Sequence, residues 1–213
     1  MSTAKEDILA RIRSSLSDAP APPAPARAYR RTGTLTHEQT VDMLIDRLED
    51  YKARVYRDTE ETLPQRINEL LGKSSSYVVP AGFNDAWLPA DSSKRSRLVD
   101  SGDATRAGAL SLKELDRVDA VITNSTVSCA ETGTVFLNSK PDEGRRAISL
   151  IPDHHICVVK EDTIVELFPE ANARVDYSRP VTMFSGPSAT SDIELIRVEG
   201  VHGPRDLDVI IVK

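Results

Sequence analysis

The chain closes with a six-residue run, Leu207 to Val212, that is apolar and largely β-branched apart from one aspartate. A strand of this kind is typical of the interior of a parallel sheet, where other layers cover both faces. Upstream, short apolar segments alternate with helical segments, and paired strands follow in the second half of the chain. This order predicts an α/β domain with a mainly parallel sheet and some antiparallel additions.

Helices are expected where a polar cap precedes apolar residues at helical spacing. Thr36 and Gln39 match a capping box, and residues 62–65 match a second one, whose helix ends at Gly72. A short helix begins at Ser111, and residues 164–168 read as another helix start. Strands are expected at 77–80, 98–99, 119–123, 133–137, 147–151, 155–159, 182–185, 193–198 and 207–212.

The N-terminal part of the chain is predicted to be a helix on a tether. Residues 1–18 contain an amphipathic helix, 19–34 form a linker rich in alanine and proline, and 35–213 form the main domain. The apolar face of the helix consists of Ile8, Leu9, Ile12 and Leu16. This helix can dock on its own domain, on a second copy or on a different subunit, or it can remain a loosely held terminus.

Charge and hydropathy argue against a nucleic-acid-binding, membrane-spanning or secreted protein. The 27 lysines and arginines are outnumbered by 33 aspartates and glutamates, so the net charge is −6 and there is no bulk attraction for nucleic acid or anionic membranes. No apolar run approaches the roughly 18 residues of a membrane span. Charges interrupt the apolar positions at the N-terminus, unlike a secretory signal, so we expect a cytoplasmic protein.

The chain has two cysteines, Cys129 and Cys157, and they form no CxxC pattern. Two thiolates are too few for a four-thiolate iron–sulfur cluster or a zinc knuckle within one chain. The simplest interpretation is that both are small buried apolar side chains.

Glu131 stands beside Thr132 and Gly133, directly before an apolar strand. Such a carboxylate can act as a general base, a nucleophile or a ligand-binding group. The alternative is that Glu131 caps a turn or pairs with an arginine.

Asp153, His154 and His155 lie together at a predicted strand junction. They can supply an acid–base pair, but adjacent histidines in a strand point to opposite faces, so we predict no shared metal site. The nearby Arg145 and Arg146 can bind a carboxylate or a phosphate, or simply form a solvated basic loop.

A third cluster follows the strand that ends near Phe184. Its Ser and Thr hydroxyls and Gly186 can cradle an anion, and His202 lies in a second Gly-Pro turn close by. The segment matches neither a P-loop nor a dinucleotide fingerprint. The alternative is that these residues only turn the chain.

Residues 119–212 resemble the LUD domain, the domain of the lactate-utilisation proteins, and the resemblance extends over about residues 35–213. The motifs that carry it are residues 119–124, 130–134, 144–147, 150–159, 185–194 and 200–205. The resemblance implies a three-layer α/β/α fold like that of CoA transferases, ribose-5-phosphate isomerase and glucosamine-6-phosphate deaminase.

The resemblance also implies a role. The chain would be a subunit of a cytoplasmic complex that oxidises L-lactate to pyruvate, with iron–sulfur clusters in two partner subunits and no cofactor in this chain. A small hydroxy acid or its oxidised product is the expected ligand. Two alternatives remain: a stand-alone enzyme related to CoA transferases or sugar-phosphate isomerases, and a non-catalytic assembly subunit.

Carried onto this sequence, the family motifs single out a set of site residues. A histidine can accept the hydroxyl proton of the substrate, and Arg145 can hold its carboxylate. The expected catalytic residues are Glu131, His154 and His202. The expected ligand-binding residues are Thr132, Gly133, Arg145, Asp153, Ser185, Gly186, Ser188, Thr190, Asp192 and Glu194.

Overall fold

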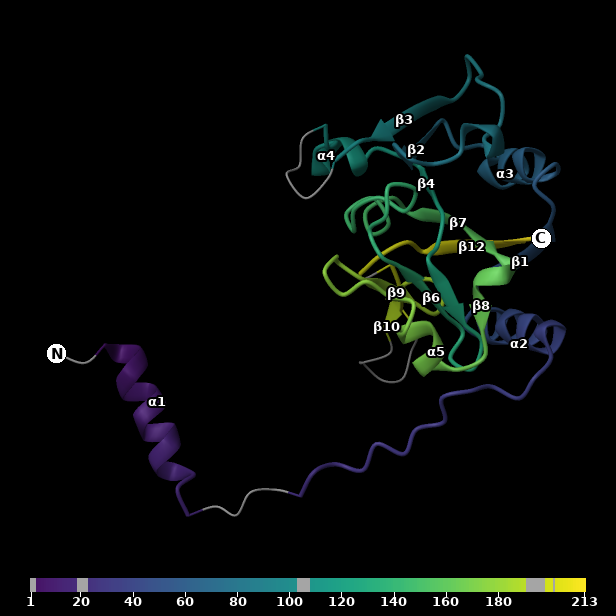
Figure 1. Cartoon of the computed structure of the whole chain (residues 1–213). Coiled ribbons are helices and arrows are strands. Elements are labelled where there is room, and N and C mark those ends of the chain that lie inside the picture. Colours follow the sequence, from purple (N-terminus) through teal and green to yellow (C-terminus); the bar gives the residue numbers. More distant parts are fainter. Residues whose placement is uncertain (1–2, 19–22, 103–107, 191–197, 201) are drawn as a thin grey trace.

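The structure is a computed structural model of the chain, and it describes residues 3–18, 23–102, 108–190, 198–200 and 202–213. Its central six-stranded sheet has only parallel pairings, in the order β1-β12-β7-β4-β2-β3 (Figure 1). The strands are β1 (Arg54–Asp58), β2 (Ser76–Pro80), β3 (Ser96–Asp100), β4 (Ala120–Thr123), β7 (His154–Lys160) and β12 (Asp206–Val212). The final apolar run is internal, between β1 and β7, and the predicted α/β class with a mainly parallel sheet is confirmed.

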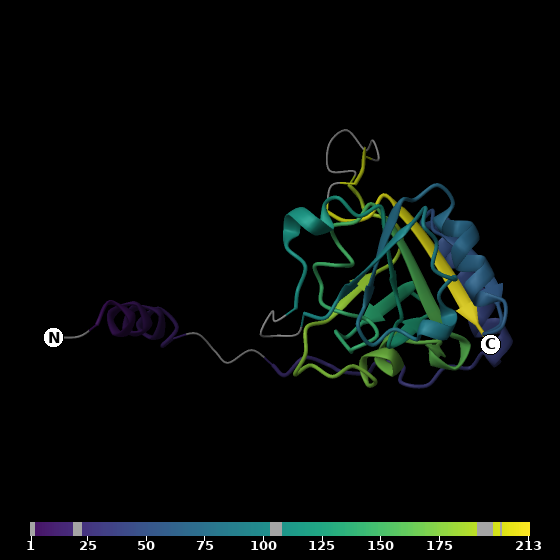
Figure 2. The same cartoon turned by 90° about the horizontal axis from the view of Figure 1, so that it is seen from above.

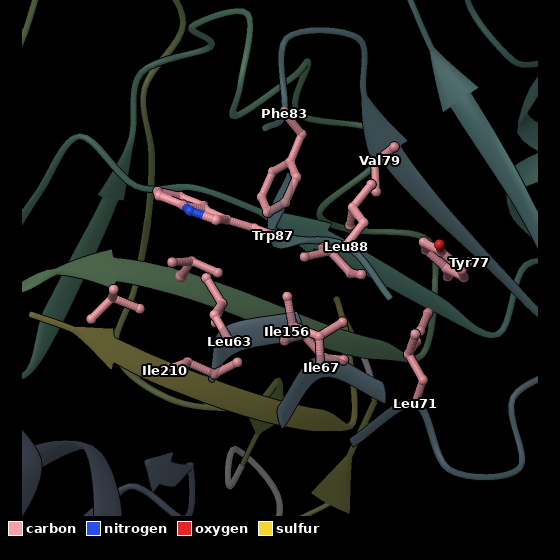
Figure 3. Close-up of a cluster of buried hydrophobic side chains, with 14 residues drawn as sticks. Leu63, Ile67, Leu71, Tyr77, Val79, Phe83, Trp87, Leu88, Ile156 and Ile210 are labelled. Carbon is pink, nitrogen blue, oxygen red and sulfur yellow. The ribbon is translucent and has the colours of Figure 1, made fainter. Parts of the chain in front are cut away.

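One face of the central sheet is covered by α3 (Leu63–Leu71) and by the 3-10 helix η1 (Asp85–Trp87). The side chains that meet in this layer include Leu63, Ile67, Trp87, Ile156 and Ile210 (Figure 3). Burying each of them contributes roughly 1.5–3 kcal/mol. Gly72 ends α3, as predicted, with a φ of 45° that glycine adopts without steric cost.

The opposite face is covered by α2 (His37–Asp50), by α4 (Leu112–Leu115) and by a second sheet. The predicted capping box of Thr36 and Gln39 starts α2. The second sheet has the order β8-β5-β6-β9, formed by β5 (Val127–Cys129), β6 (Thr134–Leu137), β8 (Ile164–Val165) and β9 (Thr182–Phe184). The antiparallel strands therefore lie in a separate sheet instead of extending the first, and the third layer contains helices and strands.

Small elements complete the domain. The helix α5 (Phe168–Asn172) packs on the second sheet, and η2 (Glu161–Thr163) precedes β8. The strands β10 (Ala189–Thr190) and β11 (Val198–Glu199) pair as a short antiparallel ribbon.

The helix α1 (Ala4–Ser15) begins with a capping box at Thr3 and Glu6 and has no buried residue. It stands clear of the domain in both views (Figures 1 and 2). No helix in the described parts of the chain is long and apolar enough to cross a membrane.

Three local predictions were wrong. Residues 147–151 form turns and not a strand, because Ile148 packs into the sheet face instead of pairing with a neighbouring strand. Residues 164–168 begin with β8, and the helix starts only at Phe168. Thr62 makes no capping hydrogen bond, since its hydroxyl donates to Asp58 at 3.0 Å.

Two further strands, β1 and β5, were not predicted from the sequence. Most of the strand expected at 193–198 lies outside the described residues.

Candidate functional site

Two clefts share the segment 139–150 as a wall. The larger cleft, of about 760 Å³, is lined by residues 81, 100–102, 139–141, 144–147 and 178–180. The smaller cleft, of about 400 Å³, is lined by residues 146, 149–150, 155, 181–184, 186–188, 202–204 and 207. The shared segment is anchored to the sheet, because the Gly82 amide donates to the Pro141 carbonyl at 2.9 Å and the Asn124 amide donates to Asp142 at 3.1 Å.

The smaller cleft brings together three of the residues singled out in the sequence: Gly186, Ser188 and His202. The Ser188 hydroxyl accepts a hydrogen bond from the His202 backbone amide at 3.0 Å, and the Ser188 amide donates to the Pro204 carbonyl at 2.8 Å. The two predicted Gly-Pro turns are thus joined through Ser188. The His202 imidazole is exposed at the mouth of this cleft.

His155, which was named in the acid–base cluster but not among the expected site residues, also lines the smaller cleft. Its Nε2 lies 2.8 Å from the Thr123 hydroxyl, and its ring lies against Phe184 with 5.2 Å between the centroids. Burial, together with the nearby charge of His154, lowers the pKa of His155 to about 3. His155 is therefore a neutral hydrogen-bonding group of the wall and not a base at neutral pH.

Arg146 is the arginine of this region that has an available guanidinium. It is exposed, lines both clefts and forms no ion pair with any residue that the structure describes. The neighbouring Arg145, which was expected to hold a carboxylate, instead binds the fully buried carboxylate of Asp100 at 2.8 Å and donates to the Leu110 carbonyl at 2.6 Å. Arg145 lines the larger cleft while its guanidinium is bound to Asp100.

Glu131 lies outside both clefts. It forms an ion pair with Arg30, and its side chain is 44% exposed. These surroundings match the alternative interpretation, in which Glu131 lies in a turn and pairs with an arginine. The same turn contains Thr132 and Gly133, and hydroxyl contacts of 2.8 Å run from Thr132 through Thr134 to Ser185.

His154 lies on the α3 face of the sheet, opposite to His155, as strand alternation predicts. Its Nε2 is 2.5 Å from the carboxylate of Asp208, which Arg54 binds at 2.7 and 3.0 Å. Burial raises the pKa of Asp208, but hydrogen bonds from His154 and Arg54 outweigh burial and hold the pKa below its ordinary value. Asp153 is exposed nearby and pairs with Arg205.

Residues 41–212 match the family model of the LUD domain. The chain belongs to the LUD domain family. The LUD chain is 44% identical to "Lactate utilization protein C" of Deinococcus radiodurans, over 90% of this chain and 85% of that protein. It is 31% identical to "Lactate utilization protein C" of Macrococcus caseolyticus, over 88% of this chain and 86% of that protein.

A solved structure shares the fold of this LUD domain. The crystal structure of a DUF162 family protein from Deinococcus radiodurans superposes with a TM-score of 0.69 at 38% sequence identity. The match covers 84% of this chain and 100% of that one.

The remaining expected residues of the LUD domain lie apart from the clefts or outside the described residues. Thr190 is in β10 and lines neither cleft. Asp192 and Glu194 lie outside the described residues. Within the described ranges, no three His, Cys, Asp or Glu side chains gather as a metal-ligand group.

Both cysteines of the LUD domain are buried, Cys129 in β5 and Cys157 in β7. Burial raises the pKa of the Cys157 thiol to about 12, so it is not a thiolate at neutral pH. The chemistry that the smaller cleft offers is therefore one guanidinium, one exposed imidazole, several hydroxyls and an apolar wall.

Proposed function

We propose that this LUD-domain protein is a subunit of a cytoplasmic complex that oxidises L-lactate to pyruvate, together with partner iron–sulfur proteins. The observation that carries the proposal is the 44% identity to a protein named "Lactate utilization protein C", over 90% of the chain. The same name recurs among relatives at 30–34% identity. Identity that extends over nearly the whole chain supports a shared role for the whole protein.

Lactate is proposed to bind in the smaller cleft. Its carboxylate would pair with Arg146, because a guanidinium forms two parallel hydrogen bonds with a carboxylate. Its methyl group would face the apolar side chains of Leu150, Phe184 and Leu207, which line the same cleft. A cleft of about 400 Å³ is wide enough for this small acid.

The proton chemistry is assigned to His202. Oxidation of lactate to pyruvate removes the hydroxyl proton and, from the carbon that bears the hydroxyl group, a second hydrogen with its bonding electron pair. The two electrons would pass to the partner proteins, and the proton of the second hydrogen would pass to solvent. An exposed imidazole at the cleft mouth can accept the hydroxyl proton, while Ser188 can orient the hydroxyl group. The partner proteins would carry the clusters that accept the electrons, and the burial of both cysteines of this chain supports that assignment.

The decisive experiment reconstitutes the system. The chain is co-purified with candidate iron–sulfur partner proteins, and lactate-dependent reduction of an artificial acceptor is measured with and without it. We expect reduction to require this chain. An unchanged rate in its absence would overturn the proposal.

The site is tested with Arg146→Gln in the reconstituted complex. Because charge-assisted hydrogen bonds to a carboxylate are lost, KM for lactate should rise by about tenfold or more. The matched control is Arg174→Gln, since Arg174 is exposed and lines neither cleft.

His202→Gln should lower kcat and change its pH profile. If the chain is required but neither Arg146→Gln nor His202→Gln alters the kinetics, the chain is an assembly subunit. Glu131, the residue on which the stand-alone CoA-transferase-like hypothesis depends, lies outside both clefts, and this position does not favour that hypothesis.

A further inference from the structure

The larger cleft opens at the carboxyl ends of β2 and β3. Pro80 and Asp100 are the last residues of these strands, and the residues that follow them, Ala81 and Ser101, line the cleft. In parallel α/β sheets this edge is where ligands bind, because the loops that follow the strands gather there. The proposed lactate site does not use this cleft, apart from the shared Arg146.

The lining of the larger cleft is strongly cationic. Its basic side chains are Lys140, Arg145, Arg146 and Arg179. Asp100 is the one acidic residue among its described lining residues, and that carboxylate is fully buried against Arg145. In a chain with a net charge of −6, this concentration of positive charge runs against the overall composition.

Two of these four basic side chains have no ion-pair partner among the described residues. Lys140 and Arg146 form no ion pair with a residue that the structure describes. Among the described residues, the ion-pair partner of Arg179 is the exposed carboxylate of Asp176, 3.6 Å away. Guanidinium and ammonium groups that outnumber the carboxylates around one cleft favour an anion with several charges.

The backbone around Lys140 is held in place. Arg179 Nη1 donates to the Ser139 carbonyl at 3.3 Å, so the two basic residues flank one peptide. Ser139 has a φ of 50°, which is uncommon for a residue other than glycine and is typical of functional loops. The Ser139 hydroxyl lines the same cleft and can donate to an anion, whereas the Ser101 and Ser178 hydroxyls already donate to the Gly108 carbonyl and to the Asp176 carboxylate.

The volume of the larger cleft indicates the size of its ligand. A cleft of about 760 Å³ is far larger than lactate needs and lies within the range of cofactor sites. Apolar groups of Ala81, Pro141, Ala147 and Pro180 line it beside the cations. We propose that the larger cleft binds a nucleoside diphosphate, with the diphosphate on Arg179 and Lys140 and the organic part against the apolar groups.

The test is calorimetric titration of the full chain with ADP and, separately, with inorganic pyrophosphate. We expect saturable ADP binding that is tighter than pyrophosphate binding and that weakens as the salt concentration rises. Arg179→Gln and Lys140→Gln should each weaken ADP binding by about tenfold. Arg117→Gln, an exposed arginine that lines neither cleft, should leave it unchanged.

Three outcomes would contradict the proposal in whole or in part. Failure of ADP to saturate the protein at millimolar concentration would overturn the proposal, and so would binding that Arg179→Gln does not weaken. Pyrophosphate that binds as tightly as ADP would rule out the nucleoside part. The assay uses neither lactate nor partner proteins, so its result is independent of the proposed lactate role.

Discussion

The imidazole Nε2 of His154 lies 2.5 Å from Oδ2 of Asp208, and the carboxylate of Asp208 is almost completely buried. Because a carboxylate oxygen only accepts hydrogen bonds, Nε2 of His154 must carry the proton. Arg54 binds the same carboxylate from β1. One side chain thus connects three adjacent strands, β1, β12 and β7, at their amino ends.

Asp208→Ala should lower the free energy of unfolding by about 3 kcal/mol, because it leaves partners of a buried carboxylate without an acceptor. Asp206→Ala is the matched control, since Asp206 contacts the same guanidinium with a side chain that is 55% exposed. That variant should cost less than about 1 kcal/mol. Urea unfolding of both variants measures the difference, and equal losses would contradict the structural role of Asp208.

His155 should make stability depend on pH. Its pKa is about 3 in the folded protein and about 6.5 in an unfolded chain. Between these values the unfolded state binds a proton that the folded state does not, so stability rises with pH up to about 6.5 and falls as pH drops below it. The slope from this group is at most about 1.4 kcal/mol per pH unit.

His155→Gln removes this titration, so its unfolding free energy should change less between pH 6.5 and 4.5 than that of the parent protein. Chemical unfolding at a series of pH values gives the comparison. His202→Gln, at an exposed position, should keep the pH dependence of the parent. Parallel curves for the parent and His155→Gln would show that His155 is not buried as a neutral group.

Deleting residues 1–28 should shift the melting temperature by no more than about 2 °C, because α1 has no buried residue. Deleting residues 1–35 should cost about 2 kcal/mol of stability, which lowers the melting temperature of a domain of this size by about 4–8 °C. The longer deletion removes the amides of Thr34 and Leu35, which donate to the buried Glu166 at 2.6 and 2.7 Å. Differential scanning calorimetry of both truncations checks this, and a large shift on removing residues 1–28 would mean that α1 packs on the domain.

Gly82→Ala should disturb the wall that both clefts share. A Cβ at this position would lie 2.7 Å from the Pro141 carbonyl carbon, so backbone would have to move. We expect a loss of about 1–3 kcal/mol of stability. Gly203→Ala is the control, because the nearest atom to its added Cβ would be 3.5 Å away. Thermal unfolding of the two variants distinguishes them, and equal stabilities would contradict the close approach.

The sequence predicts the fold best where burial dominates. Apart from Asp208, residues 207–212 are apolar on both faces, and they form an internal strand as expected. Residues 54–58 escaped notice because an edge strand tolerates charges such as Arg54 and Arg57. Residues 147–151 were predicted as a strand because they are mostly apolar. In the structure they form turns, and their apolar side chains cover a face of the sheet. Apolar content alone does not distinguish a strand from a turn that packs on a sheet.

The candidate site was predictable only in part. Gly186, Ser188 and His202 stand in two turns that their sequence motifs mark, and the structure brings them into one cleft. Arg145 is ion-paired and Arg146 is not, because Arg145 binds Asp100. Asp100 is 45 positions away from Arg145, so the local sequence does not predict this pair. The expected role of Glu131 rested on its motif, while its partner Arg30 is 101 positions away.

The position of β12 has a consequence for how the chain acquires its structure. β1 is an edge strand that pairs with β12 alone, and the residues that join them, Arg54 and Asp208, are 154 positions apart. During synthesis, β1 therefore remains unpaired until almost the entire domain has been translated, because β12 is at the end of the domain. Contacts between such distant segments slow folding, and an unpaired strand exposes backbone to aggregation meanwhile. The nascent chain thus has a long interval in which a chaperone that covers β1 would raise the yield of native protein.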